Sequence, residues 1–357
     1  MKTYIKFIIN LFNASFFKVF FIFFLVIVIT GIFEQVEFFK NEDLNFFYLF
    51  FLSFLNAPSI IFEILPFIFL LSTQIFFINL IDKKELEIFK YSGLNNLIIV
   101  KIISLYAFIM GLIFIVIFYN ASAVLKKSYL LIKNKYSDDN KYLAVITENG
   151  LWIKDEINNN INIINANKVN NQFLLDVSIT QFNNKFEITK IIQSKKVDIS
   201  SNKWKLFDPL ILTNTKSQTL DEIEINSNFD LKKITSLFSN LSSLTIMELF
   251  TLRKSYLTLN YSIIDVDSQL YRVGSYPVYL TLITIFGAIV MFNIGYQKNT
   301  FFKITLGIFF SVIIYYINYF CNVLGTNEKI PLTLSIFLPL IILSIINFIS
   351  IIRLNEK

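Results

Sequence analysis

The sequence predicts an α-helical polytopic membrane protein with six transmembrane helices and an inserted all-β domain. Mean hydropathy is +0.59, and of the 357 residues 55% are hydrophobic and 16% are charged. Soluble domains carry about 25% charged residues. Six long apolar runs and one polar stretch account for nearly the whole chain. We therefore expect three spans, then a β domain, then three more spans.

Each apolar run is long enough to cross a membrane. A hydrocarbon core of about 30 Å requires about 20 apolar residues in an α-helix. No cleavage motif of small residues follows Gly31, so the first run is expected to be retained rather than removed as a signal peptide. A short approach helix, Asn45–Asn56, precedes the second span. The predicted spans are Phe16–Phe33, Pro58–Ile81, Leu97–Phe118, Val273–Ile294, Phe302–Cys321 and Pro331–Ile352.

The polar stretch between the third and fourth spans reads as a β domain. It is rich in Asn, Lys, Ser and Thr, and segments such as YLAVITENGLWIK and QFLLDVSITQF alternate apolar and polar residues. Short alternating segments separated by turn residues are typical of an all-β sandwich or jelly roll. The predicted domains are residues 1–124 with spans one to three, 125–271 with the β-jelly roll and a return linker, and 272–357 with spans four to six.

The charges of the short loops predict the orientation, because cytoplasmic loops carry an excess of Lys and Arg. With the N-terminus inside, the outer loops hold Lys40 and Lys329 among five acidic residues, Glu34, Glu37, Glu42, Asp43 and Glu328. Both termini are therefore expected in the cytoplasm and the β domain outside. The basic residues assigned to the cytoplasmic side are Lys2, Lys6, Lys83, Lys84, Lys90, Lys298, Lys303, Arg353 and Lys357.

Several classes of function are excluded by the residue inventory. The chain has no histidine, and Cys321 is its single cysteine, which excludes His-based catalytic triads, an internal disulfide and a thiolate metal cluster. No two of the nine glycines are five residues apart, so the phosphate-binding patterns GxxxxGK[ST] and GxGxxG are both absent. We expect no cofactor, and any energy from ATP must come through a partner.

A short charged segment, KKELEIFKYSGLN, connects the second and third spans. Asp82 can cap a helix whose third residue is Glu85, and Gly93 is placed to end it. Leu86 and Phe89 fall on one side of this helix, away from the charged residues. Two interpretations follow from the residues alone. Glu85 is only a cap in a solvated connection, or the helix docks onto a partner.

Four stretches together resemble the lipopolysaccharide export permeases of the LptF/LptG family. KKELEIFKYSGLN is similar to the family's Glu-Leu pattern with its following glycine. NGLWIKDEINNNINIINANKV resembles the Gly-Leu-Trp start of the family's periplasmic β-jelly roll, most of all that of LptG. NAPSIIFEILPFIFLL resembles the second span, and SVIIYYINYFCNVLGTNEKIPLTLSIFLP resembles the fifth and sixth spans.

The resemblance implies the permease subunit of an ABC transporter in the bacterial inner membrane, with no enzymatic activity of its own. It implies pairing with an LptF-like permease, docking onto an LptB-like ATPase dimer, and transfer of lipopolysaccharide to LptC- and LptA-like periplasmic β-jelly-roll proteins. No nucleic acid is implied. Residues 82–93 would form the coupling helix, whose contacts with the ATPase would be Glu85, Leu86, Phe89 and Gly93.

Residues for the lipid are expected at the outer end of the first span and in the aromatic fifth span. Relatives often carry basic residues at the outer end of the first span, whereas Glu34 takes the first such place here and Lys40 follows. The candidates for lipid contact are Phe33, Lys40, Tyr316, Tyr319 and Phe320.

Three other functions stay open at this point. A membrane enzyme could use Glu34 and Glu37 as paired carboxylates, although no nucleophile or base accompanies them. A permease for another envelope lipid or for lipoproteins would ordinarily carry its large outer domain after the first span. A non-transporting envelope scaffold would show no ATPase stimulation by lipopolysaccharide.

Overall fold

The computed structural model describes residues 3–40, 42, 44–136, 151–157, 160–170, 172–183, 186–213, 217–231, 234, 240–258, 261–294 and 299–355. Lys2, Asp43, Lys298 and Lys357, which enter the charge comparison of the loops, lie outside the described residues. The chain divides into two units, residues 1–126 with 264–357 and residues 127–263. The second unit ends at residue 263, and the helix Ile264–Ile294 follows it.

Six described helices are long and apolar enough to cross a membrane, which confirms the predicted number of spans. Most extend beyond the apolar windows of the sequence at one or both ends. The third is continuous through a π-helical segment. They are α1 (Thr3–Phe38), α2 (Phe46–Asp82), α4 (Asn96–Ile113) with η1 (Phe114–Tyr119) and α5 (Asn120–Lys135), α8 (Ile264–Ile294), α9 (Thr300–Thr326) and α10 (Leu332–Asn355).

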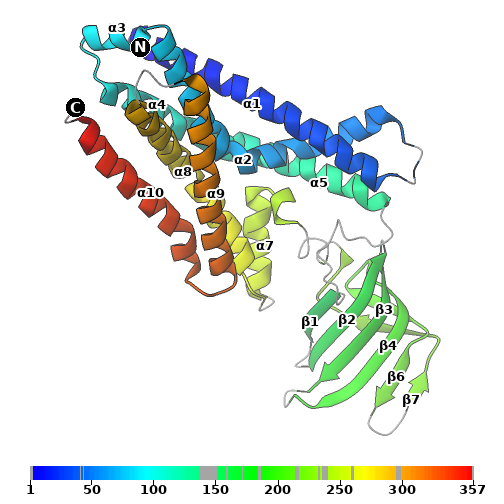
Figure 1. Ribbon diagram of the computed structural model, residues 1–357. Coiled ribbons are helices and arrows are strands. Elements are labelled where there is room, and N and C mark those ends of the chain that lie inside the picture. Colours follow the sequence, from blue (N-terminus) through cyan, green and yellow to red (C-terminus); the bar gives the residue numbers. More distant parts are fainter. Residues whose placement is uncertain are drawn as a thin grey trace. The chain divides into compact units, whose positions relative to one another are not determined.

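α2 is the most enclosed of the six described spans. It packs along α1 and contacts α8 and α9, while α10 packs against α8 and α9 (Figure 1). The predicted approach helix Asn45–Asn56 is not separate but forms the start of α2. Pro58 does not end α2, since membrane helices tolerate proline where neighbouring groups satisfy the freed backbone.

The second unit contains one antiparallel sheet among its described residues, in the order β1-β2-β3-β4-β5-β8, with β6 pairing with β4 and β7. The inserted β domain is thus confirmed, although its described strands join in a single sheet that branches at β4. The predicted segment YLAVITENGLWIK is described only from Leu151 onward. The strands are β1 (Leu151–Ile157), β2 (Asn160–Asn170), β3 (Phe173–Phe182), β4 (Ile188–Asp198), β5 (Lys203–Phe207), β6 (Leu210–Thr213), β7 (Ser217–Thr219) and β8 (Glu222–Asn226).

Apolar residues that alternate with polar ones along the strands form the core of this sheet. Ile164 on β2, Ile179 on β3 and Ile192 on β4 are paired across neighbouring strands and are all buried. Trp204 on β5 is also buried, and its indole Nε1 donates a hydrogen bond of 2.6 Å to the Phe229 carbonyl. The return segment after the sheet is not a plain linker, because it contains η2 (Leu241–Ser243) and the helix α7 (Ile246–Thr258).

Candidate functional site

The charged segment between α2 and the third span forms the short helix α3 (Glu85–Tyr91). Its start differs from the prediction. Asp82 is the last residue of α2, and Lys84 adopts a left-handed conformation (φ 58°) that turns the chain between the two helices. Glu85 is therefore the first residue of α3 and not the third, and the described structure contains no side-chain cap there. The expected capping arrangement is wrong.

The end of α3 is as predicted. Gly93 has φ of +79°, a conformation that costs other L-residues about 1–2 kcal/mol. Its N–H donates to the Lys90 carbonyl at 3.0 Å, and the Leu94 N–H donates to the Phe89 carbonyl at 2.9 Å. This pair of bonds is a Schellman motif, which satisfies the last carbonyls of a helix. Gly93 therefore ends α3 sharply.

The apolar and charged side chains of α3 are distributed differently from the expectation. Leu86 is 1% exposed, so in this structure its side chain packs within the chain. Phe89 is half-buried, and its ring lies 5.9 Å from that of Phe7. The exposed apolar side chains of α3 are instead Ile88 and Tyr91.

The carboxylate of Glu85 is partly enclosed. Its Oε2 is inaccessible to solvent and has no hydrogen-bond partner among the described residues. Glu87, two residues later, is exposed. A buried, unpaired carboxylate oxygen is costly, because charged groups lose more free energy on desolvation than neutral ones do. No donor among the described residues satisfies this oxygen in this structure.

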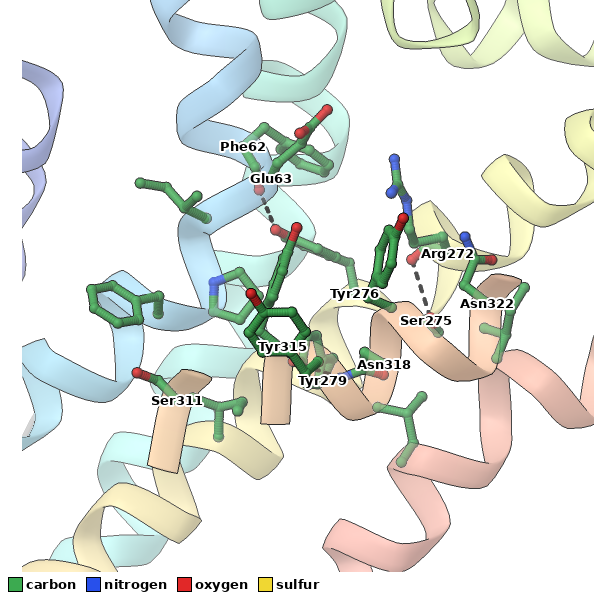
Figure 2. Close-up of a pocket in the computed structure, with 18 of the residues that line it drawn as sticks. Phe62, Glu63, Arg272, Ser275, Tyr276, Tyr279, Ser311, Tyr315, Asn318 and Asn322 are labelled. Carbon is green, nitrogen blue, oxygen red and sulfur yellow. Dashed lines mark hydrogen bonds between the residues drawn. The ribbon is translucent and has the colours of Figure 1, made fainter. Parts of the chain in front are cut away.

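A second feature is a cavity of about 510 Å³ inside the first unit. Its walls come from α2, α8, α9 and α10, with Phe23 from α1 (Figure 2). Most of the wall is aromatic or aliphatic, while a few polar groups point inward. Such a mixture of apolar walls and convergent polar groups is typical of ligand sites.

Proline explains one polar contact of the cavity wall. Pro66 in α2 has no N–H, so the Phe62 carbonyl four residues earlier loses its helical partner. The Tyr276 hydroxyl on α8 donates to that carbonyl. The rings of Phe62 and Tyr276 stack with centroids 4.5 Å apart. Two helices are thereby joined at the cavity wall by one residue pair.

On the α9 side of the cavity, Asn318 Nδ2 donates to the Tyr279 hydroxyl oxygen at 2.7 Å. The polar tips of Tyr276 and Tyr279 are thus held inside the bundle, and their rings line the cavity. Hydrogen bonds of this kind offset the cost of desolvating buried hydroxyls and amides. The wall presents aromatic surface without unpaired polar atoms at these positions.

Two opposite charges line the cavity. Glu63 on α2 and Arg272 on α8 have their charged groups toward the same end (Figure 2). Arg272 donates to Gln269 Oε1 at 2.8 Å, and Gln269 Nε2 donates to the Tyr119 hydroxyl at 3.2 Å. Ionisable residues within a span are rare and functional. The sequence analysis missed both, although a lone Glu inside the second apolar run was a usable signal.

A family model described as "Lipopolysaccharide export system permease LptF/LptG" matches residues 6–353. The chain belongs to the LptF/LptG family. It is a multi-pass, non-catalytic permease of the lipopolysaccharide export system, the membrane-spanning part of an ABC transporter. The alternative of a membrane enzyme that uses Glu34 and Glu37 is thereby set aside. The comparison with curated proteins found no match.

For this LptF/LptG permease, the residues expected to touch lipid fall in two groups. Tyr316 and Tyr319 line the cavity with half or more of each side chain exposed. Phe33, Lys40 and Phe320 are exposed but are not part of the cavity wall. Their contact with lipopolysaccharide stays a prediction, as do the contacts of Glu85, Leu86, Phe89 and Gly93 with an ATPase.

Proposed function

We propose that this chain is the LptG-type half of a heterodimeric permease. Its partners are an LptF-like permease and an LptB-like ATPase dimer, and its substrate is lipopolysaccharide in the inner membrane. Both termini and α3 lie in the cytoplasm, and the β unit lies in the periplasm. The β unit passes the lipid to LptC- and LptA-like bridge proteins.

The observation that carries the ATPase contact is the enclosed Oε2 of Glu85, which has no partner among the described residues. The Schellman end at Gly93 and the buried Leu86 hold α3 rigidly, so the carboxylate has a defined position. A rigid surface helix can transmit closure of a soluble subunit to the spans. A charge-assisted hydrogen bond from a basic group of the ATPase would satisfy the free oxygen.

The size of the cavity supports a second permease subunit around the substrate. Its volume of about 510 Å³ lies within the range of roughly 300–1,000 Å³ that holds a drug-sized ligand. A lipid with several acyl chains is larger, and each CH₂ exposed to water costs about 0.8 kcal/mol. One subunit alone therefore cannot cover the substrate, and a second permease must complete the enclosure.

The assignment to the LptG type rests on the Gly-Leu-Trp stretch at the start of the β unit, of which Leu151 and Trp152 belong to β1. Co-purification tests it. This chain should form a stable complex with an LptF-like subunit and the ATPase, and not with an LptG-like subunit. A stable complex with the LptG-like subunit would reverse the assignment.

The ATPase contact is tested by a matched pair of variants in the reconstituted complex. Glu85→Gln removes the charge of the enclosed carboxylate, and Glu87→Gln removes an exposed charge on the same helix. Loss of one partner of a buried charge pair costs roughly 2–5 kcal/mol, which is a loss of one or more orders of magnitude in coupling. ATP-driven release of lipopolysaccharide should fail for Glu85→Gln and persist for Glu87→Gln. Normal release by Glu85→Gln, or equal losses in both variants, would contradict the contact.

A further inference from the structure

α7 exposes an apolar face although it belongs to the polar, inserted part of the chain. Met247 is 76% exposed, Phe250 56% and Leu257 50%, and Lys254 is exposed between them. With spacings of three, four and three residues, these four side chains share one side of the helix. They are called here the exposed face of α7. Leu249 and Leu252, which lie on another side, are buried.

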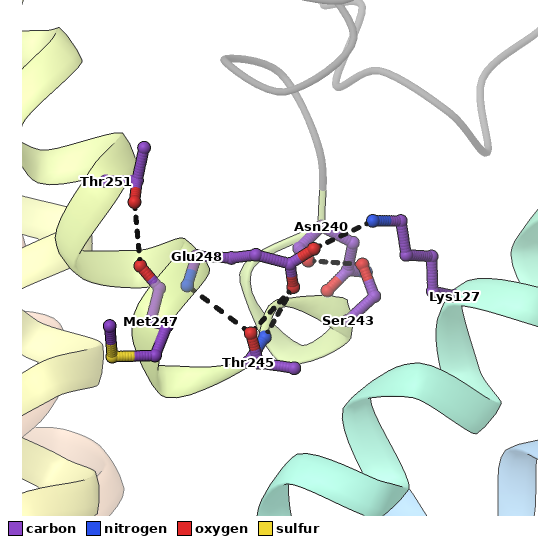
Figure 3. A network of polar contacts seen from close by, with 7 residues as sticks. All are labelled: Lys127, Asn240, Ser243, Thr245, Met247, Glu248 and Thr251. Atoms are coloured by element: carbon purple, nitrogen blue, oxygen red, sulfur yellow. Dashed lines mark hydrogen bonds and ion pairs between the residues drawn. The ribbon is translucent and has the colours of Figure 1, made fainter.

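The start of α7 is fixed by a polar network (Figure 3). The N–H and hydroxyl of Thr245 donate to Glu248 Oε2 at 2.8 and 2.9 Å, and the Glu248 N–H donates to Thr245 Oγ1 at 3.3 Å. This is a capping box. The other carboxylate oxygen, Oε1, accepts from Lys127 Nζ at 2.9 Å. Lys127 belongs to α5, which continues the third span, so the first turn of α7 is tied to that span.

The other end of α7 is held by the chain itself. Thr258 is the last residue of α7, and Ile264 is the first residue of the fourth span. Six Cα–Cα steps cover at most about 22 Å. The short connection therefore limits how far the end of α7 can lie from the start of the helix that begins at Ile264.

The charge of the exposed face distinguishes a lipid surface from a protein partner. Lys254 stands between Phe250 and Leu257 on that face, and the one acidic residue of α7, Glu248, is bound to Lys127. Lysine is depleted in the core of protein interfaces, where its charge would be desolvated. At a bilayer surface its stem can lie along acyl chains while the ammonium group reaches the head groups.

We propose that α7 is an interfacial helix whose exposed face is inserted among the lipids of the leaflet next to the β unit. Met247, Phe250 and Leu257 contact acyl chains, and Lys254 contacts anionic head groups. The inserted helix anchors the return from the β unit to the fourth span at the membrane surface. The proposal goes beyond the transport assignment and does not depend on it.

Spin labels on the full-length chain test this placement. The assembled transporter is reconstituted in nanodiscs of phosphatidylethanolamine and phosphatidylglycerol, with Cys321→Ser as the background. Single cysteines replace Phe250 and Leu257 on the exposed face. Gln218→Cys, exposed on β7, is the water reference, and Ile341→Cys, exposed in the middle of α10, is the lipid reference. Collision with oxygen and with a water-soluble nickel chelate is measured at each position.

The labels at 250 and 257 should collide more with oxygen and less with the nickel chelate than the label at 218, approaching the values at 341. Nickel collision equal to that at 218 would place α7 in water and overturn the proposal. Low collision with both reagents would mean that protein covers the face, which overturns it equally. Because both labels replace exposed side chains, each variant is expected to fold, and the two positions must agree.

Discussion

The short helices α3 and α7 each place a glutamate near their start, but the two carboxylates are treated in opposite ways. Glu248 in α7 accepts hydrogen bonds from the Thr245 N–H, the Thr245 hydroxyl and Lys127. Glu85 in α3 has an enclosed oxygen without any partner among the described residues. A carboxylate that accepts hydrogen bonds from its own helix stabilises that helix. A carboxylate that lacks donors can instead gain free energy from a hydrogen bond to a partner protein.

The two helices also differ in which side chains they expose. α3 encloses Leu86 and leaves charged residues such as Glu87 and Lys90 exposed. α7 pairs its acidic residue Glu248, whose side chain is 40% exposed, with Lys127 and exposes Met247 and Phe250. A charged, rigid surface suits a protein partner with a complementary charge, and an apolar surface with one lysine suits lipid. Position along the chain alone would not have separated the two roles.

The largest expected effect comes from reversing the charge at Glu85. Glu85→Arg should abolish ATP-coupled release of lipopolysaccharide, because the variant both loses the acceptor and places a positive charge beside the basic ATPase group proposed to bind it. Glu87→Arg, exposed on the same helix, should retain most of the activity. Release and membrane abundance are measured together for the two variants. Equal defects would show that α3 acts only through its overall charge.

A smaller effect is expected at the end of α3. Gly93→Val forces a branched residue into a left-handed conformation and should destabilise the end of the helix by about 1–2 kcal/mol. Gly93→Asn should cost less, because Asn tolerates this conformation. Nothing lies within 4 Å of a Cβ built at this position, so the difference reports backbone strain rather than steric overlap. Hydrogen exchange of the α3 amides measures it, and identical exchange in both variants would refute the strain argument.

The capping box of α7 predicts a pH dependence. Partial burial by itself would raise the pKa of Glu248, but the hydrogen bonds from Lys127 and Thr245 outweigh it and hold the pKa below its ordinary value. The folded state therefore binds the proton less tightly than the unfolded state does. The resulting stability is present above the ordinary glutamate pKa and is lost as the pH falls through the lower folded value.

The protection factors of amides 246–249, corrected for the intrinsic pH dependence of amide exchange, should fall on acidification in the wild type, and Glu248→Gln should remove this acid-induced step. The loss at the cap should be about 0.5–2 kcal/mol. Thr245→Ala is the companion variant, because it removes the hydroxyl of the box but keeps the ion pair with Lys127. A wild-type profile that stays flat with pH would show that the network does not hold the first turn.

The smallest expected effect concerns Lys40, which is exposed beyond the end of α1. Lys40→Glu should reduce loading of lipopolysaccharide a few-fold while leaving complex assembly intact. An exposed ion pair contributes about 0–1 kcal/mol, and salt screens it. Photo-crosslinking yield at low and high ionic strength measures the effect. A defect that does not change with salt would argue for a structural role of Lys40.

Local sequence patterns were sufficient to predict the helices and strands of this fold. The six apolar runs became six spans, and the alternating segments became antiparallel strands, because hydropathy and period depend on neighbours in the sequence. Gly93 was recognisable as a helix end for the same reason, since the left-handed conformation is a property of one residue. The start of α3 was mistaken, because the turn at Lys84 depends on how α2 and α3 pack.

The sequence by itself determined the class of the protein, the order of spans and β domain, and the family to which the chain belongs. Only the tertiary structure decided which face of each element is enclosed. Leu86 is buried, Met247 is exposed, and Glu63 and Arg272 line the same cavity although more than 200 residues separate them. The physical reason is that the burial of a side chain depends on the residues that pack against it from another helix. The hydropathy of a local stretch of sequence does not identify those residues.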